Sequence, residues 1–323
     1  ILVSIRHYCL QTTRLLYITA ILHRQEVNMS LGIQMHQGTV NSPHQQADFY
    51  RLPAASDEAN YRLFQFGAGE NHVQLRVPPA KRVTVFFGYR GDQSIMQLLL
   101  LTDALRRSGA EQIDLLLPYM PGARQDRVCN VGEALSVKVY ASLINQQQYA
   151  SVSIFDPHSD VTAALLDRVQ VIDNHSFVAA IAAQLTGDLV LVSPDAGANK
   201  KVFGLAKALQ GMPVIRADKH RDVVNGHIIA TEVFCDDLSG KTCLIVDDIC
   251  AGGRTFIELA IKLKQKGAQS VILIVSHYED KACESALREA GIDRLFCTDS
   301  LGVPTHISSE FCHCHAVLRF MNH

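Results

Sequence analysis

The chain has 323 residues, which is more than one small core needs and, at about 100–200 residues per domain, predicts two domains. Its 30 basic and 32 acidic residues give a net charge of -2, which excludes the basic surface of a general nucleic-acid binder and favours small-molecule partners. With 48% hydrophobic and 19% charged residues, the chain has ample apolar material for a packed core, which excludes a disordered protein.

Residues 1–28 are considered apart from the rest, because they begin with Ile1 and hold three arginines before the first acid, Glu26. Three interpretations stay open: an arginine-bearing transit peptide, an ordered extension, or sequence upstream of a natural start at Met29. We favour the last and treat residues 1–28 as a non-native or untranslated leader. No stretch reaches the about 20 apolar residues that span a membrane, so no membrane partner is expected.

From about Arg82 onward, short apolar, β-branched runs alternate with segments of helical period, which is typical of βαβ units and parallel sheets. We expect an α/β protein of two similar lobes, each a mainly parallel sheet flanked by helices. The run Val169–Asn174 is the natural junction, giving domains 29–170 and 171–323. An alternative is that the last strand belongs to the first domain. Strands are expected at Val83–Phe87, Ile113–Leu117, Val152–Phe155, Leu189–Val192, Val214–Arg216, Cys243–Val246, Val271–Val275 and Arg294–Cys297. Helices are expected at Ile95–Arg107, Glu133–Asn145, Phe177–Gln184, Ala198–Leu209, Thr255–Lys266 and Lys281–Ala290.

The nine cysteines are an odd number and are scattered, which argues against a secreted disulfide framework and favours a cytoplasmic location. The one dense Cys/His cluster is Cys312-His313-Cys314-His315. Alternate residues of a strand share a face, and a closed zinc site needs more reach than this tetrad has. We therefore expect a C-terminal strand there rather than a metal site.

Polar segments follow several predicted strands, and ligands of open α/β sheets bind beyond the carboxyl ends of the strands. The richest segment places Asp247 and Asp248 after an apolar strand, followed by Gly252, Gly253 and the start of a helix. Glycines let backbone N–H groups converge on an anion, and adjacent acids can hold sugar hydroxyls or orient a hydrated Mg²⁺. The alternative is an ordinary turn with an aspartate cap, although two acids and two glycines exceed what capping needs.

This segment resembles the phosphoribosyl-binding signature of ribose-phosphate pyrophosphokinases (PRPP synthetases) and of phosphoribosyltransferases. The run Leu117–Arg127 is similar to the "PY…ARQDR" segment of the synthetases' ATP site, which ordinary transferases lack. Four further segments match the synthetases in family order, so that the resemblance covers about Phe66 to Thr305. These segments are Phe66–Glu70, Phe155–Ser159, Val192–Gly197 and Lys219–Arg221.

The resemblance implies two phosphoribosyltransferase-like lobes, an N-terminal one that binds ATP and a C-terminal one that binds ribose phosphate. It implies transfer of the β,γ-diphosphate of ATP to the anomeric hydroxyl of ribose 5-phosphate, giving PRPP and AMP, with Mg²⁺ as cofactor and in a homo-oligomer, a dimer or a hexamer. By resemblance, ATP would be bound by Phe66, Glu70, Arg124, Gln125 and Asp126, and the metal by His158 and Asp195. Ribose phosphate would be bound by Asp247, Asp248, Gly252, Gly253, Arg254 and Thr255, and the catalytic groups would be Lys219 and Arg221.

The segment Ala251–Thr255 departs from the family, whose loop usually reads Asp-Thr-(Ala/Gly/Cys)-Gly-Thr. It loses a carboxylate and a hydroxyl, and it gains the guanidinium of Arg254, whose bulk is expected to crowd the loop. One hypothesis is therefore that the acceptor is a substituted ribose 5-phosphate such as ADP-ribose. A second is a non-catalytic homologue that regulates a true synthetase, and a third, least favoured because of Leu117–Arg127, is a phosphoribosyltransferase. Taken singly, His158 could be a turn residue, Asp195 a helix cap, and Lys219 and Arg221 a solvated loop.

Overall fold

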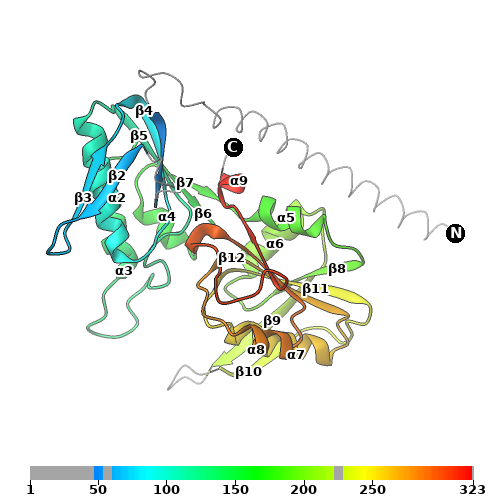
Figure 1. Ribbon diagram of the computed structural model, residues 1–323. Helices are drawn as coiled ribbons and strands as arrows, with labels where there is room; N and C mark the ends of the chain where they lie inside the picture. Colours follow the sequence, from blue (N-terminus) through cyan, green and yellow to red (C-terminus); the bar gives the residue numbers. More distant parts are fainter. Residues whose placement is uncertain (1–46, 54–59, 222–227, 322–323) are drawn as a thin grey trace. The chain divides into compact units, whose positions relative to one another are not determined.

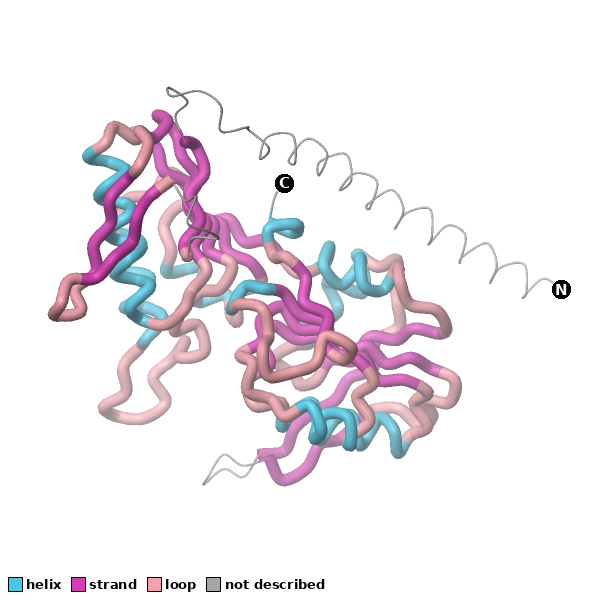
Figure 2. Tube along the Cα trace, in the orientation of Figure 1, coloured by secondary structure: helices cyan, strands magenta, loops and turns pink. Residues whose placement is uncertain are grey.

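The computed structural model describes residues 47–53, 60–221 and 228–321, so the predicted leader lies outside the described residues. Those residues form two units. The N-terminal unit runs to Asp173 and also takes in Asp299–Gly302 and the residues from Ala316 onward, whereas the C-terminal unit comprises Asn174–Thr298 and Val303–His315. In each unit the strands run side by side and helices flank them (Figure 2).

The N-terminal unit is built on a parallel sheet with the strand order β1-β4-β5-β6-β7. Its strands are β1 (Ala47–Leu52), β4 (Pro79–Phe87), β5 (Gln112–Leu117), β6 (Ser151–Phe155) and β7 (Val169–Ile172). Its longer helices are α2 (Asp92–Arg107) and α3 (Ser136–Asn145), with the short α4 (Asp160–Leu165) and the terminal α9 (Leu318–Met321). A separate antiparallel hairpin of β2 (Tyr61–Gln65) and β3 (Asn71–Leu75) packs against α2.

The C-terminal unit has a larger sheet with the order β10-β9-β8-β11-β12-β13-β14, parallel except for the β9–β10 pair. Its strands are β8 (Asp188–Ser193), β9 (Val214–Arg221), β10 (Ile228–Val233), β11 (Lys241–Cys250), β12 (Ser270–Tyr278), β13 (Arg294–Thr298) and β14 (Cys312–His315). The helices α5 (His175–Ala182) and α6 (Asn199–Ala208) lie on one face, and α7 (Arg254–Gln265) and α8 (Glu284–Glu289) lie on the other (Figure 1).

Both cores follow from the sequence pattern. In α2, Leu98, Leu101 and Leu105 recur at helical spacing and are fully buried. They belong to the same core as Val85 and Phe87 of β4. In the C-terminal unit, the apolar run of β12 is buried along its length, as expected of a central parallel strand covered on both faces. No helix in the described ranges is long and apolar enough to cross a membrane.

The predicted fold class is confirmed, because both sheets are mainly parallel and flanked by helices. Each predicted strand and helix is present, with ends displaced by a few residues and with β9 and β11 longer than expected. The prediction did not include β1, the β2–β3 hairpin, β10, α4 or α9, and β7 occupies the run taken as the junction. The last strand does not join the N-terminal sheet but pairs with β13, because its Cys312–His315 ladder continues the C-terminal sheet.

Candidate functional site

The C-terminal sheet has a switch point between β8 and β11. From β8 the chain passes to β9 on one side, whereas β11 lies on the other side of β8 and continues to β12. The two strands are parallel, and their pairing ends at Ile245 and Val192. Such a reversal leaves a crevice at the carboxyl ends of the two strands, where ligands of open α/β sheets bind. The residues that follow Val192 and Ile245 therefore lie where the topology favours a ligand.

Three carboxylates gather at this switch point. The sequence predicted that Asp247 and Asp248 follow the strand, but β11 extends to Cys250 because it stays paired with β12 beyond the end of β8. Asp248 is buried, and its N–H donates a hydrogen bond of 2.9 Å to Oδ1 of Asp247. Burial, followed by the charges of Asp248 and Asp195, raises the pKa of Asp247 well above its usual range. A bound cation or hydroxyl donor would relieve this unfavourable concentration of negative charge.

Asp195 also holds the turn from β8 into α6. Its Oδ1 accepts a hydrogen bond of 3.1 Å from the N–H of Ala198, and the Ser193 hydroxyl donates one of 3.1 Å to the Asp195 carbonyl. The alternative that Asp195 caps the helix is wrong, because the N-cap residue of α6 is Ala198 and no side chain caps this helix; Asp195 holds the turn before it. This turn fixes the Asp195 side chain at the place where its charge acts on Asp247.

The loop between β11 and α7 depends on Gly253, whose φ of +77° lies in the left-handed region. A Cβ at Gly253 would lie 3.0 Å from the Cβ of Ala282 and 3.2 Å from Cδ2 of Leu287, so packing and backbone both require glycine. A Cβ at Gly252, by contrast, would meet no atom within 4 Å. The loop therefore leaves open space at Gly252, next to a helix start whose first N–H groups have no partner within the helix.

Arg254 begins α7, and its side chain is 63% exposed. Its Nε donates a hydrogen bond of 3.0 Å to Oε1 of Glu258, one helical turn later, and the Thr231 hydroxyl donates one of 3.4 Å to Oε2 of the same carboxylate. The expectation that Arg254 crowds the loop is wrong, because the ion pair holds the guanidinium along α7 and the space at Gly252 stays open.

In the N-terminal unit, the segment that carries Arg124, Gln125 and Asp126 follows β5 at the carboxyl edge of the sheet. It begins with a tight turn in which the Gln125 N–H donates to the Gly122 carbonyl over 3.0 Å. Gly122 has a φ of +71°, and a Cβ there would lie 2.7 Å from the Tyr140 ring. The turn exposes Arg124 to solvent and leaves Gln125 and Asp126 partly buried.

Glu133 holds the rest of this loop, although no motif in the sequence singled it out. Its carboxylate accepts hydrogen bonds from the N–H groups of Cys129 (2.9 Å) and Asn130 (3.1 Å) and from Nε2 of Gln125 (3.3 Å). The side-chain amide of Asn130, followed by these N–H groups, lowers the pKa of Glu133. A glutamate several residues after a run of turn residues was the only signal that the sequence offered.

Phe66 and Glu70 lie on the turn of the β2–β3 hairpin rather than at the edge of the five-stranded sheet. The Phe66 N–H donates to the Glu70 carbonyl over 2.9 Å, which closes the turn. The Phe66 ring is 54% exposed and lies 5.4 Å from the Phe64 ring and 5.8 Å from the His72 ring. The structure thus puts these two residues on the hairpin turn and Arg124 on the loop after β5, and the role of Phe66 and Glu70 at adenine stays a prediction.

The two predicted metal ligands belong to different units. His158 is exposed and follows β6 in the N-terminal unit, and Asp195 follows β8 in the C-terminal unit. Within the described ranges, no group of three or more His, Cys, Asp or Glu side chains could hold a metal ion. Mg²⁺ keeps several waters and is held by one or two protein groups together with substrate phosphates, so the carboxylates at the β8–β11 switch point fit an ion that arrives with its substrate.

Lys219 and Arg221 were expected in a loop, but their backbone belongs to the end of β9. Lys219 pairs with Thr231 and Arg221 with Ile228 across the antiparallel β9–β10 ladder. The reason is the β-branched run of β10, which the sequence analysis did not take as a strand. The side chains of Lys219 and Arg221 lie outside the part of the molecule that the structure describes, so their catalytic role stays a prediction.

The Cys312–His315 segment forms the strand β14, as predicted. The His313 ring stacks on Phe296 at 5.0 Å, and the His315 ring lies edge-on to Phe177 at 5.7 Å. The two histidines therefore pack against aromatic rings in the C-terminal unit.

Comparison with known proteins places both units. Residues 59–147 match the family model of the N-terminal domain of ribose phosphate pyrophosphokinase, and residues 171–309 match that of the phosphoribosyl transferase domain. The chain is 32% identical over 249 residues to a ribose-phosphate pyrophosphokinase from Mycoplasma pneumoniae, covering 73% of this chain and 75% of that one. It is 30% identical over 217 residues to the enzyme of that name from Prochlorococcus marinus, covering 66% of this chain but only 64% of the relative.

Among solved structures, phosphoribosylpyrophosphate synthetase from Mycobacterium smegmatis has a similar fold, with a TM-score of 0.70 at 22% identity. The match covers 84% of this chain and 95% of that one. The two matching domain models and the Mycoplasma relative show that the chain belongs to the ribose-phosphate pyrophosphokinase family.

Proposed function

We propose that the protein is an ATP-dependent ribose-phosphate diphosphokinase, which transfers the β,γ-diphosphate of ATP to the anomeric hydroxyl of ribose 5-phosphate and yields PRPP and AMP. The observation that carries the proposal is the switch point between β8 and β11, where Asp195, Asp247 and Asp248 adjoin a glycine loop and a helix start. Family membership supplies the reaction class, and the named relatives are ribose-phosphate pyrophosphokinases.

In this proposal the chain's own groups mainly bind and position the substrates, as is usual for phosphoryl-type transfer. Asp247 and Asp248 would accept hydrogen bonds from the ribose hydroxyls, which offset the lost hydration and the repulsion that raise the pKa of Asp247. The N–H groups of residues 252–255 would hold the 5-phosphate in the open space at Gly252.

Arg124 and Gln125 would bind ATP, Arg124 through charge-assisted hydrogen bonds to phosphate. Lys219 and Arg221 would supply positive charge where negative charge develops during transfer. His158 and Asp195 would hold Mg²⁺, which neutralises phosphate charge when it is bound. We also propose a cytoplasmic location, because the cysteines that the structure describes are all free thiols, and a homo-oligomer, a dimer or a hexamer.

The test is to incubate the pure protein with Mg-ATP and ribose 5-phosphate and to quantify AMP and PRPP. Arg124→Ala is expected to lower kcat/KM for ATP by roughly 10–150-fold, since a hydrogen bond to a charged group contributes about 1.5–3 kcal/mol. The matched control is Arg82→Ala, because Arg82 is exposed and ion-paired to Asp114 over 2.6 Å near the start of β4, away from the carboxyl edge of the sheet. Equal effects of the two variants would contradict the placement of ATP.

One observation favours a second acceptor. The space at Gly252 is open, and the neighbouring guanidinium of Arg254 is exposed, so a 5-phosphate that carries a further phosphate would have both room and a cation. ADP-ribose is such an acceptor, and it belongs in the same assay beside ribose 5-phosphate. If no AMP is released with either acceptor, the result would favour the non-catalytic regulator. Consumption of PRPP that depends on an added base would favour a phosphoribosyltransferase.

A further inference from the structure

Cys297 and Cys312 lie in contact on neighbouring strands of the C-terminal sheet. In the parallel ladder, Cys312 pairs with Leu295 and Cys314 pairs with Cys297, so all four side chains share one face. The sulfur atoms of Cys297 and Cys312 are 3.6 Å apart, and both side chains are buried. Both are free thiols.

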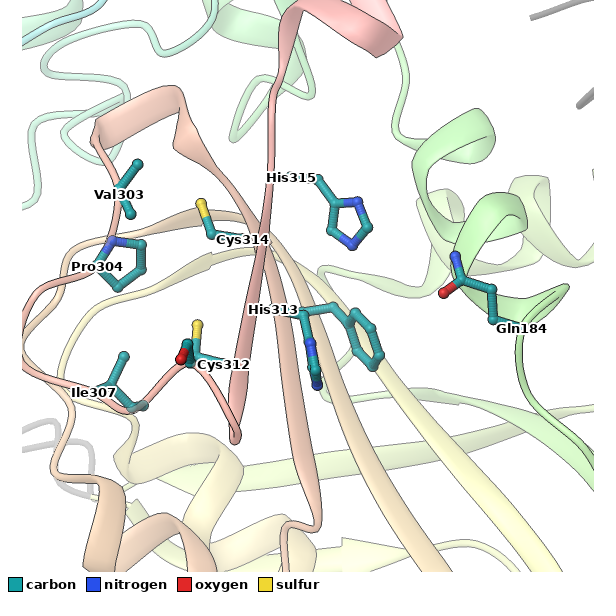
Figure 3. Close-up of a pocket in the computed structure, with 10 residues that line it drawn as sticks. Gln184, Val303, Pro304, Ile307, Cys312, His313, Cys314 and His315 are labelled. Carbon is teal, nitrogen blue, oxygen red and sulfur yellow. The ribbon is translucent and has the colours of Figure 1, made fainter. Parts of the chain in front are cut away.

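A cavity of about 440 Å³ reaches this pair. Cys312 and Cys314 line it, and Figure 3 shows their sulfur atoms on the side of Val303, Pro304 and Ile307, whereas His313 and His315 face the side of Gln184. Cys297 does not line the cavity and is fully buried. A small oxidant in the cavity therefore meets Cys312 and Cys314 before it can meet Cys297.

We propose that Cys297 and Cys312 form a reversible disulfide when the protein meets hydrogen peroxide. The Cys312 thiol loses its proton and attacks peroxide as the thiolate, so that an S–O bond forms, the O–O bond breaks and the leaving hydroxide takes up that proton to give water. The Cys297 sulfur then attacks the Cys312 sulfur, so that the S–S bond forms, the S–O bond breaks and a second water leaves. Two thiols are oxidised, and one peroxide is reduced to two waters.

The surrounding structure brings the two sulfurs together and leaves room for the bond. A disulfide is about 2.05 Å long, so the sulfurs must approach by about 1.5 Å. Because β14 is the edge strand and pairs on one side only, it can make this shift without breaking a second ladder. Hydrogen bonds with Cys312 and then Cys314 raise the pKa of Cys297, which is consistent with Cys312 being the first nucleophile.

The connection between the two strands is tied down as well. The Asp280 carboxylate accepts hydrogen bonds from the N–H (2.7 Å) and hydroxyl (2.9 Å) of Thr305, and Glu284 accepts them from the N–H (2.6 Å) and hydroxyl (2.8 Å) of Ser308. These hydrogen bonds limit the motion of the chain between Cys297 and Cys312, and this keeps the two sulfur atoms close to each other.

The experiment treats the folded full chain with peroxide and maps its thiols without reduction. Cleavage after Arg294, Glu310 and Arg319 puts Cys297 on one peptide and both Cys312 and Cys314 on another, so a disulfide appears as a linked pair that dithiothreitol separates. Cys283 is exposed, and its lowered pKa makes it a competing target, so Cys283→Ser is the background for every sample.

We expect the linked pair in this background and in its Cys314→Ser derivative, and its loss in the Cys312→Ser derivative. Fragmentation of the linked peptides from the background protein identifies the partner of Cys297 without further substitution, which keeps the test valid if a buried variant does not fold. A link from Cys297 to Cys314 would overturn the assignment. So would the recovery of all three thiols free under conditions that oxidise the exposed Cys129.

Discussion

Replacing Gly253 with alanine is expected to destabilise the C-terminal unit, whereas the same change at Gly252 is not. Gly253 has a φ of +77°, which costs a non-glycine residue about 1–2 kcal/mol. The added methyl would lie 3.0 Å from the Ala282 Cβ and 3.2 Å from Cδ2 of Leu287, and such overpacking costs about 1–3 kcal/mol. The free energy of unfolding of Gly253→Ala should therefore fall by about 2–5 kcal/mol.

Urea unfolding followed by circular dichroism measures this difference. Gly252→Ala, whose methyl meets no atom within 4 Å, should stay within about 0.5 kcal/mol of the original protein. The same variant should weaken ribose 5-phosphate binding by roughly tenfold, about 1.4 kcal/mol, because its methyl enters the space where we place the 5-phosphate. Equal stability of the two variants, or tighter binding by Gly252→Ala, would refute the reasoning about this loop.

Three further changes test the charges and one buried contact. Because the pKa of Asp247 is raised in the folded protein, stability should fall as pH rises from the unfolded value of about 3.9 through the folded value, and Asp247→Asn should remove this slope from urea unfolding at a series of pH values. If ADP-ribose is the acceptor, Arg254→Gly should lower kcat/KM for ADP-ribose by roughly tenfold and change kcat/KM for ribose 5-phosphate by no more than about twofold. Both values are measured by the release of AMP. Tyr149→Phe removes the 2.7 Å hydrogen bond to the Thr102 hydroxyl and should lower the free energy of unfolding by about 1–2 kcal/mol.

Each of these predictions has an outcome that contradicts it. A pH slope that survives in Asp247→Asn would place the titrating group elsewhere. A parallel loss with both acceptors would show that Arg254 acts through its ion pair with Glu258 rather than on the second phosphate. No change in Tyr149→Phe would mean that the buried hydroxyl pair does not stabilise the N-terminal unit.

The sequence predicted the elements that alternate regularly. The strands β4, β5, β6, β8, β11, β12 and β13 are rich in apolar residues because their sheets are flanked by helices, and such runs stand out without any tertiary information. The β2–β3 hairpin was missed because it is short and separate from both sheets, and only Tyr61 and Val73 of its strands are buried. The strand β10 was missed because its partner, the end of β9, is polar and looks like a loop.

The site was predictable in its residues but not in its geometry. Asp247, Asp248 and Asp195 were identified by their places after strands, whereas the pKa shift that links them depends on the β8–β11 switch, which no local pattern shows. The crowding predicted for Arg254 was wrong because the position of Glu258 one turn later was not considered. Glu133 was missed because two of its hydrogen bonds come from backbone N–H groups, which any sequence offers.

The division of the chain between the units has a consequence for biosynthesis. The whole of Asn174–Thr298 separates Asp299 from Asp173, where the main part of the N-terminal unit ends. The Asp299 carboxylate lies 3.6 Å from the Arg51 guanidinium and accepts a 2.7 Å hydrogen bond from the Val317 N–H, and Arg90 donates to the Ser300 carbonyl over 3.3 Å. Domains usually fold in the order in which the ribosome releases them. Here the unit that is synthesised first is completed last. Arg51 and Arg90 cannot bind Asp299 and Ser300 until almost the whole second sheet has been synthesised.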